Sequence, residues 1–278
     1  MRQFQTKSKL TRYLNVYRNK RSIGLVPTMG ALHSGHLALI KAAKKKCDIV
    51  VCSIFVNPMQ FNNIEDFTNY PNTINKDLEK LKTLNCNVVY TPKINDIYAQ
   101  GENVKEFNFG PMAENMEGKF RPGHFNGMAT IVEKLFNIIL PTQAFFGQKD
   151  LQQLQLIKAL VQKMGLPIEI ISITTYREKN GLAKSSRNQR LSKKAKNKAS
   201  IIYNCLKYCA QNKHKGVINL KLYIQNIFKS QKYCKLEYAE IVDIENMLPI
   251  NKWGAKNKNA ICIATHIEGV RLIDNIIL

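Results

Sequence analysis

The feature that most constrains this fold is a near-continuous apolar segment, DIVVCSIFV, at residues 48–56. A strand with one solvated face alternates apolar and polar residues, whereas a strand covered on both faces is apolar throughout. Strands of the second kind belong mainly to parallel sheets, whose crossover connections are usually helices. Helical patterns at Leu37–Lys46 and Thr73–Leu84 flank the segment as such crossovers would. The segment therefore predicts an α/β fold with a parallel sheet.

The alternation of strand and helix patterns continues to about residue 173. Gly127–Leu140 has a strong helical pattern that stops at Pro141, because proline has no N–H with which to continue a helix. One further helix is predicted at 150–164, and further strands are predicted at 22–27, 87–90, 143–146 and 168–173. We therefore expect a Rossmann-like parallel sheet with crossover helices.

The pattern changes after Thr175. Two lysine-rich amphipathic segments, 192–211 and 216–229, predict helices, and three strands follow them at 236–242, 260–266 and 270–274. Helices and strands grouped in this way are typical of α+β domains. We predict a Rossmann-like domain in residues 1–175 and a smaller α+β domain in residues 176–278.

Composition narrows the class of protein. Of the 278 residues, 45% are hydrophobic, which is enough for a folded core despite a net charge of +22. No apolar run approaches the ~18 residues of a membrane-spanning helix, and residues 1–14 lack the apolar region of a secretory signal. The seven cysteines include no Cys-x-x-Cys pair, so neither a zinc ribbon nor a disulfide framework is indicated. We expect a cytoplasmic protein with buried thiols and no membrane partner.

The positive charge is concentrated in residues 179–235, which contain 15 Lys and Arg and no Asp or Glu. The other 221 residues contain 27 basic and 20 acidic side chains. A strongly basic balance is typical of nucleic-acid-binding proteins. The aromatic residues of this segment lie among apolar residues, as helix-core positions do, so lysine-rich solvated helix faces are the simpler interpretation.

Two histidines stand at a predicted strand–helix junction, PTMGALHSGHL, at residues 27–37. Such junctions bind ligands in α/β sheets, and the first turn of the helix offers unpaired N–H groups and a positive dipole end to an anion. His33 and His36 are three residues apart and so project from one face of the helix. Gly35 lets a flat group approach closely. The pattern favours a nucleotide site over a zinc site, because no convincing Cys or Glu lies nearby as a third zinc ligand beside the two histidines.

A second segment, AKSSRN at residues 183–188, combines two hydroxyl groups, a lysine and an arginine in a loop. These groups are suited to phosphate oxygens. Alone the pattern is common on protein surfaces. Together with the His-Ser-Gly-His junction it resembles the nucleotidylyltransferase superfamily, in which a HIGH-type element and a KMSKS-type loop close on ATP.

Three more segments narrow the resemblance: SIFVNPMQF at 53–61, EGKFRPGHFNG at 117–127 and FGQKDLQQL at 146–154. With the two ATP elements, they closely resemble the pantothenate synthetase (pantoate–β-alanine ligase) family. The resemblance runs in order from about residue 22 to residue 190 and returns at residues 271–275.

The resemblance implies a two-step reaction. Pantoate is adenylated by ATP with loss of pyrophosphate, and β-alanine then displaces AMP from the pantoyl-adenylate to give pantothenate. Catalysis of the first step is largely positioning and charge neutralisation at the phosphates. The family also implies a homodimer, and ATP implies Mg²⁺. Asp77 is a candidate contact for that ion, but we predict no ligand set because magnesium relies largely on phosphates and water.

The resemblance also implies residues for the ATP site. His36 would be the catalytic donor, His33 would face the phosphates, and Lys149 would bind phosphate in the transition state. The ATP-binding residues would be Met29, Gly30, Ala31, Leu32, His33, Ser34, Gly35, His36, Gly147, Gln148, Lys149, Asp150, Tyr176, Lys184, Ser185, Ser186 and Arg187.

Pantoate would be held by Gln60 and Gln153, because neutral amides bond both a hydroxyl and a carboxylate without adding charge. Gln60 would also contact β-alanine. Further candidates near this pocket or on a neighbouring flap are Asn57, Tyr70, Arg121 and His124.

Three residues depart from the family pattern. Gln148 stands where a glutamate is expected, Lys184 where an apolar residue is expected, and Tyr176 where a small aliphatic residue is expected. These departures affect the fit of ATP rather than the reaction. Lys184 could supply an extra cation to the phosphates.

Two other functions fit part of the pattern. Another adenylyl- or cytidylyltransferase would share both ATP elements, but Asn57, Gln60 and Gln153 favour a pocket for a small hydroxy acid. A nucleic-acid-binding protein would use residues 179–235 but leaves the ordered motifs unexplained. We therefore expect small-molecule substrates and no specific nucleic-acid partner.

Overall fold

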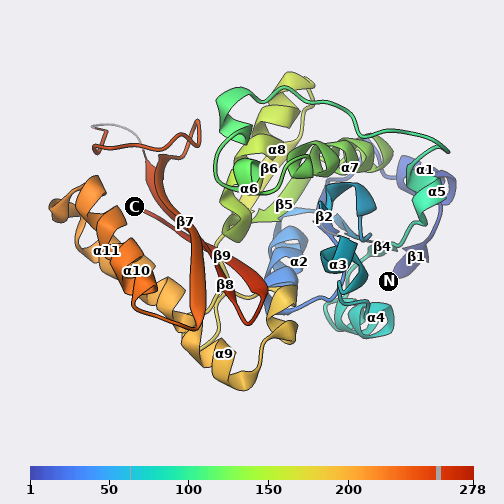
Figure 1. Cartoon of the computed structure of the whole chain (residues 1–278). Helices are drawn as coiled ribbons and strands as arrows, with labels where there is room; N and C mark the ends of the chain where they lie inside the picture. Colours follow the sequence, from blue (N-terminus) through green and yellow to red (C-terminus); the bar gives the residue numbers. More distant parts are fainter. Residues whose placement is uncertain (63, 255–257) are drawn as a thin grey trace.

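Two β-sheets lie in separate lobes of the molecule (Figure 1). The computed structural model describes residues 1–62, 64–254 and 258–278. All strand pairs of the larger sheet are parallel, in the order β1-β4-β3-β2-β5-β6. The strands, in that order, are Arg2–Phe4, Val88–Tyr90, Ile49–Ile54, Ile23–Thr28, Gln143–Gly147 and Glu169–Ile173.

Helices cover both faces of the parallel sheet (Figure 1). Neighbouring residues of one strand serve opposite faces: Val51 of β3 packs with one apolar cluster, whereas Val50 and Cys52 pack with another. The first cluster includes side chains of α1 (Lys7–Asn15), α7 (His124–Ile139) and α8 (Leu151–Lys163). The second includes side chains of α2 (Ser34–Lys46) and α4 (Ile74–Thr83). This two-sided burial explains the continuous apolar run at β3.

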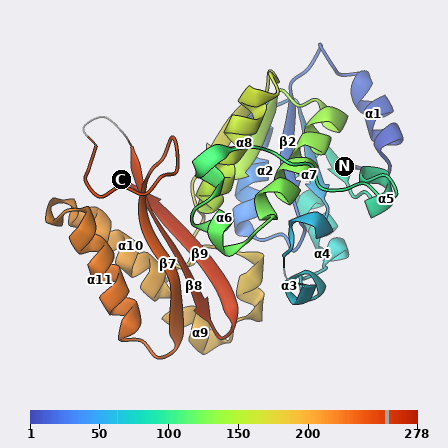
Figure 2. The ribbon, with the colours of Figure 1, turned by 45° about the horizontal axis from the view of Figure 1, so that its top comes forward.

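The second lobe contains an antiparallel sheet of three strands, β7 (Cys234–Asp243), β8 (Asn259–Ile267) and β9 (Val270–Ile277). Ile261 and Ile263 of β8 pack with the helices α9, α10 and α11 (Lys193–Lys198, Ser200–Gln211 and Val217–Lys229), which lie together on one side of the sheet (Figure 2). Ala260 and Cys262 alternate with them and pack with the core of the first lobe. The second sheet is therefore covered on both faces, once by its own helices and once by the first lobe.

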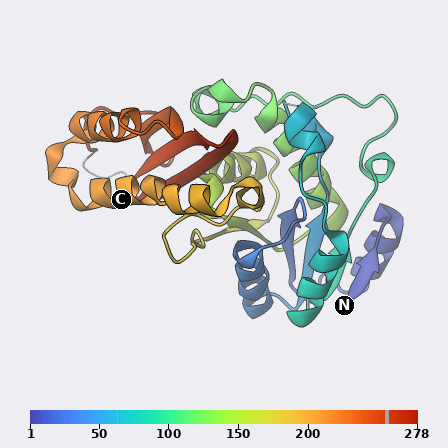
Figure 3. The same cartoon turned by 60° about the horizontal axis from the view of Figure 1, so that its bottom comes forward.

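Short helices occupy the connections. They are η1 (Pro58–Gln60), α3 (Ile64–Thr68), α5 (Ile94–Ile97), η2 (Gly110–Ala113), α6 (Glu117–Phe120), η3 (Gln148–Asp150), η4 (Ser186–Arg190) and η5 (Lys213–Lys215). The N-terminus lies in the first lobe and the C-terminus in the second (Figure 3). Among the described residues, no helix is long and apolar enough to cross a membrane.

The predicted α/β fold with a smaller α+β part is confirmed, and each predicted strand has a counterpart in the structure. The single helix predicted at 192–211 is wrong, because the structure has two helices that meet at Ala199. The Ser200 hydroxyl donates to the Asn197 carbonyl at 2.7 Å, which competes with the regular helical hydrogen bonds there. β1 and α1 have no counterpart among the predicted elements.

Candidate active site

A cavity of about 250 Å³ opens at the carboxyl ends of three neighbouring strands, β3, β2 and β5. Its walls include Thr28 of β2, Asn57 after β3 and Gly147 of β5. From β2 the chain proceeds to β3 and β4 on one side, whereas from β5 it proceeds to β6 on the other. β2 and β5 therefore flank a topological switch point, where open α/β sheets bind ligands. Tyr238 and Asn275 of the second lobe complete the wall.

The first turn of α2 is built from two histidines. His33 is the N-cap residue, and its Nδ1 accepts a hydrogen bond from the Gly35 N–H at 3.1 Å. The His33 N–H in turn donates to Nδ1 of His36 at 3.3 Å, which completes a capping box. The two rings stack with their centroids 4.0 Å apart. A Cβ atom on Gly35 would lie 2.9 Å from Cε1 of His33, so glycine leaves room for this ring.

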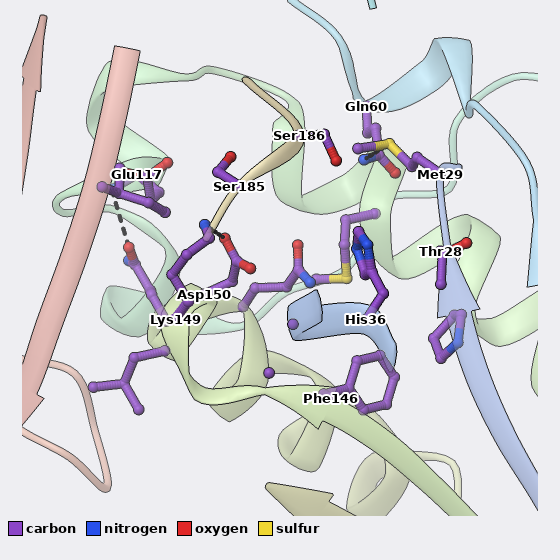
Figure 4. A pocket seen from close by; sticks show the side chains of 18 of the residues that line it. Thr28, Met29, His36, Gln60, Glu117, Phe146, Lys149, Asp150, Ser185 and Ser186 are labelled. Atoms are coloured by element: carbon purple, nitrogen blue, oxygen red, sulfur yellow. Dashed lines mark hydrogen bonds and ion pairs between the residues drawn. The ribbon is translucent and has the colours of Figure 1, made fainter. Parts of the chain in front are cut away.

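Both histidines are neutral at pH 7. Burial, together with the nearby His36 and Lys149, lowers the pKa of His33 to about 2. Burial also lowers the pKa of His36 to about 4, although Asp150 opposes the shift. Because each Nδ1 accepts a backbone N–H, the single proton of each ring lies on Nε2. Both residues line the cavity, where they supply two uncharged N–H donors (His36 is labelled in Figure 4).

The loop before the histidines is held from α4 by Asp77. Its two carboxylate oxygens accept hydrogen bonds from the N–H groups of Ala31 (2.8 Å) and Leu32 (2.7 Å). Ala31 has a φ of +49°, a conformation that costs a non-glycine residue free energy unless its surroundings hold it. The Leu32 carbonyl accepts from Lys80 Nζ at 2.6 Å. Asp77 therefore anchors the loop that precedes α2, and its role as a contact for magnesium stays a prediction.

Lys149 enters the cavity from η3, after β5. Its Nζ lies 2.9 Å from Oδ1 of Asp150, and Figure 4 shows this pair on the same side of the cavity as Glu117. The backbone beneath it is fixed from the second lobe, because Nδ2 of Asn275 donates to the carbonyls of Gln148 (3.0 Å) and Lys149 (2.8 Å). A side chain on β9 thus sets the position of a cation on the first lobe.

The serine–arginine loop, residues 183–190, also lines the cavity, through Lys184, Ser185, Ser186 and Arg187. Ser185 is the N-cap of η4, and its Oγ accepts the Arg187 N–H at 3.3 Å. The Ser186 hydroxyl donates to the Ala31 carbonyl at 3.2 Å, so the loop touches the histidine loop directly. The Arg187 guanidinium binds the Asp66 carboxylate of α3, with Nη2 2.7 Å from Oδ2. Sequence analysis did not assign Asp66, since nothing in its local pattern distinguishes it from a solvated acidic residue.

Lys184 and Tyr176 also line the cavity. The Lys184 Nζ forms an ion pair with Glu178 at 2.5 Å, so its charge is already partnered without ATP. Tyr176 is 48% exposed and lies at the cavity mouth, where a bulkier side chain than the expected aliphatic one is accommodated.

Amide side chains form the inner part of the cavity. Gln60 is buried, donates from Nε2 to Sδ of Met29 at 2.9 Å and accepts from Nδ2 of Asn57 at 3.2 Å. The Asn57 Nδ2 also donates to the Gly127 carbonyl at 3.1 Å. A Cβ atom on Gly127 would lie 2.0 Å from the Met59 carbonyl oxygen, so α7 approaches this segment closely only because residue 127 is glycine. Gln153 and Tyr70 also line the cavity.

A chain of buried polar groups connects Gln60 to the second lobe. The Gln60 carbonyl lies 2.8 Å from Nδ1 of His124, whose Nε2 lies 3.0 Å from Nη1 of Arg121. Glu117 accepts a hydrogen bond from Arg121 at 3.4 Å and two from Arg271 of β9 at 2.7 and 2.8 Å. Burial would raise the pKa of Glu117, but the arginine hydrogen bonds and charges outweigh it and lower the pKa to about 2. Burial lowers the pKa of His124 to about 3, so this ring is neutral.

Most of the residues predicted for the site line this cavity. The exceptions among the predicted ATP-binding residues are Gly30, Ala31, Leu32, Ser34 and Gln148. Ala31 and Leu32 are buried, and both present their N–H groups to Asp77 rather than to the cavity. In the part of the chain that the structure describes, no group of three or more His, Cys, Asp or Glu could hold a metal ion.

The family model and the known sequences that match this chain point to the same family. The family model for pantoate-beta-alanine ligase matches residues 2–277. The pantothenate synthetase of Christiangramia forsetii is 45% identical over 264 residues, which cover 93% of this chain and 92% of the relative. The pantothenate synthetase of Flavobacterium psychrophilum is 42% identical over 281 residues, which cover 99% of both chains.

Solved structures agree with the sequences. The pantothenate synthetase from Thermus thermophilus superposes with a TM-score of 0.92 at 34% identity and covers 99% of both chains. The pantoate-beta-alanine ligase from Francisella tularensis, solved with β-γ ATP and β-alanine, superposes with a TM-score of 0.84 at 37% identity. That match covers 99% of this chain and 97% of the other. With motifs, fold and relatives in agreement over nearly its whole length, this chain belongs to the pantoate–β-alanine ligase family.

Proposed function

We propose that this ligase makes pantothenate in the cavity at the switch point, in two steps. In the first, a carboxylate oxygen of pantoate attacks the α-phosphorus of ATP, and pyrophosphate leaves with the electrons of the broken P–O bond. In the second, the amine of β-alanine attacks the acyl carbon of pantoyl-adenylate, loses a proton and displaces AMP. The observation that carries this proposal is the meeting of two neutral histidines, Lys149 and the buried Gln60 in one cavity.

His33 and His36 would serve the phosphates as neutral donors. A neutral Nε2–H stabilises charge that develops on phosphate oxygens and leaves no unpaired cation buried when the phosphates depart. Their Nδ1 atoms are engaged by backbone N–H groups, so the rings are oriented before substrate arrives. We assign His36 as the catalytic donor, with His33 beside it.

Cations would neutralise the negative charge on the oxygens of the pentacoordinate phosphorus and on the leaving pyrophosphate. Lys149 lies at the cavity wall with Asp150 as its counter-ion. A triphosphate carries more negative charge than this one carboxylate and would therefore attract the Lys149 ammonium group more strongly. Ser185, Ser186 and Arg187 would close over the β- and γ-phosphates, since their loop lies against the histidine loop. Gly147 and Asp150 would face the ribose and adenosine, and Tyr176 would lie near the base.

Pantoate would occupy the amide-lined end. Gln60 and Gln153 line this region and can bond its hydroxyl and carboxylate groups without adding charge. Gln60 would also contact the incoming β-alanine, since its backbone carbonyl lies 2.8 Å from Nδ1 of His124, which is next to Arg121. The ATP and β-alanine found in the Francisella tularensis relative support these two substrates.

Magnesium would enter with ATP. Bound to the triphosphate, it supplies charge neutralisation at the phosphate oxygens. The described residues offer no cluster of three or more metal-ligating side chains, so the ion would rest on phosphates and water. Asp150 is the lining carboxylate with the greatest access to it, because its side chain is 42% exposed.

We propose that residues 1–175 bind ATP and pantoate and that residues 176–278 act as a lid that carries the Lys184–Arg187 loop. The separate sheets support this division. The family supports a homodimer, whose mass light scattering would measure. All seven cysteines are described and have free thiols, which supports a reducing compartment such as the cytoplasm.

The experiment that tests the proposed function is AMP release from ATP and pantoate, with and without β-alanine. We expect steady release of AMP and pantothenate only when all three substrates are present. A control without pantoate reports simple hydrolysis of ATP. Release of AMP or of a dinucleotide at the same rate without β-alanine would support a different nucleotidylyltransferase and would contradict this function.

A further inference from the structure

One carboxylate on the first lobe holds two arginines of the serine–arginine loop. Asp66 of α3 accepts hydrogen bonds from Arg187 through Nη2 (2.7 Å) and Nε (3.3 Å), and from Nη1 of Arg190 at 3.1 Å. Burial would raise the pKa of Asp66, but the pairing with Arg187 outweighs it, so the pKa is lowered. Asp66 is therefore ionised at neutral pH, and the two guanidinium groups share its charge.

The two arginines lie in different places. Arg187 lines the cavity of the histidines and also a second cavity of about 290 Å³, which adjoins the first at Lys149 and Asp150. Arg190 lines only the second cavity. A triphosphate that enters the first cavity therefore has access to Arg187 and competes with Asp66 for it, while Arg190 stays on Asp66. Their side chains are 23% and 34% exposed, respectively, so neither ion pair is fully open to water.

The loop also touches the first lobe through Ser186, which forms a side-chain hydrogen bond with Tyr70. The Ser186 hydroxyl donates to the Ala31 carbonyl at 3.2 Å, and Asn188 Nδ2 bonds only within the loop, to the Ala183 carbonyl at 3.0 Å. If Arg187 were the only arginine on Asp66, its transfer to ATP would break the ion pair that holds η4 to α3. With Arg190 also bound to Asp66, the loop stays held on α3 while Arg187 binds the phosphate.

We propose that Asp66 and Arg190 are positioning residues that keep the serine–arginine loop docked on α3 while Arg187 is transferred from Asp66 to the ATP phosphates. This inference rests on the proposed function, because it assumes that Arg187 binds ATP. Arg190 touches neither substrate in this account, and its effect on ATP passes through Asp66.

The test is a double-mutant cycle on ATP affinity with Arg190→Gln, Asp66→Asn and the combined variant. We expect Arg190→Gln to raise the KM for ATP about fivefold, the upper range for a partly exposed ion pair, with kcat and the KM for pantoate within about twofold of wild type. In the Asp66→Asn background, Arg190→Gln should add less than about twofold. Arg190→Lys should recover most of the ATP affinity, because it retains the charge.

Lys221→Gln is the matched control, since it breaks an ion pair of similar exposure with Glu240, a pair that lines neither cavity. The inference is overturned if Arg190→Gln leaves the KM for ATP unchanged, or if it has the same effect with and without Asp66. Failure of the proposed function is distinguishable, because the wild-type protein would then show no β-alanine-dependent AMP release.

Discussion

At the scale of single residues, the site depends on side chains that bond the backbone through one atom and leave another atom for a ligand. In His33 and His36, Nδ1 is bonded to the backbone of the helix start and Nε2 remains for a ligand. The sequence predicts this pair well, because both histidines and Gly35 lie in one local motif. It does not predict the role of Asp77, whose partners are 45 and 46 residues away along the chain.

Replacing His33 by Asn should flatten the pH dependence of stability. The pKa of His33 is lowered to about 2 by burial, so below pH 6.5 the unfolded state binds a proton that the folded state does not. Stability therefore falls as the pH drops, by up to about 1.4 kcal/mol per pH unit for this residue. Asparagine keeps an N-cap acceptor but does not titrate.

Urea unfolding of wild type and His33→Asn between pH 6.5 and 5 would measure this difference in slope. Gln162→Asn, at an exposed position of α8, is the control and should keep the wild-type slope, because neither side chain titrates. Equal slopes for wild type and His33→Asn would show that the folded protein binds the proton as readily as the unfolded chain.

Gln60→Ala should weaken pantoate binding about tenfold, since about one or two hydrogen bonds are lost at ~1 kcal/mol each. ATP binding should change little, because Gln60 lies beside Asn57 at the amide-lined end of the cavity. Titration calorimetry with pantoate measures this affinity, and Gln162→Ala, at an exposed position of α8, is the control. Unchanged pantoate affinity in Gln60→Ala would remove Gln60 from the substrate site.

At the scale of elements, strands and helices with a strong local pattern are predictable from the sequence, and those set by their neighbours are not. β3 is predictable from its apolar run, and α7 from its helical pattern and Pro141. β1 has only three residues, two of them exposed, and exists because it pairs with β4 at the sheet edge. The 192–211 segment is amphipathic throughout, so its periodicity does not reveal the break at Ala199.

Asp77→Asn should destabilise the protein by about 2–3 kcal/mol, because an amide in this position leaves a buried backbone N–H without an acceptor. The loop that precedes α2 would loosen with it, so the KM for ATP should also rise. Urea unfolding measures the first effect, with Glu79→Gln, an exposed position on α4, as control. Wild-type stability with an altered magnesium requirement would instead favour Asp77 as a metal contact.

At the scale of the whole molecule, the site is completed by contacts between lobes. Arg271 of β9 binds Glu117, and Asn275 of β9 binds the backbone at Lys149. These pairs are separated by 154 and 126 residues, and no local pattern indicates such a contact. Family resemblance draws attention to the motif at 271–275, but its physical role, to join the second sheet to the catalytic loop, is visible only in the structure.

The same scale explains the basic segment. Its helices α10 and α11 bury apolar side chains against β7–β9, among them Ile202, Leu206, Leu220 and Ile224. Most of its lysines are exposed, on α9, α10, η5, α11 and the connections between them, while Lys184 and Arg187 line the cavity. Only a small share of the net charge of +22 is therefore placed to meet ATP.

The central claim is that this cavity forms pantoyl-adenylate with His36 and Lys149 as its main catalytic groups. The most direct test is a single-turnover, rapid-quench measurement of pantoyl-adenylate from ATP and pantoate without β-alanine. His36→Ala and Lys149→Ala should each lower this rate by ~10²-fold or more, the scale expected for loss of one transition-state donor. Lys46→Ala, at an exposed position of α2, should form the adenylate at the wild-type rate. Wild-type rates in both His36→Ala and Lys149→Ala, with the fold intact by circular dichroism, would contradict the account.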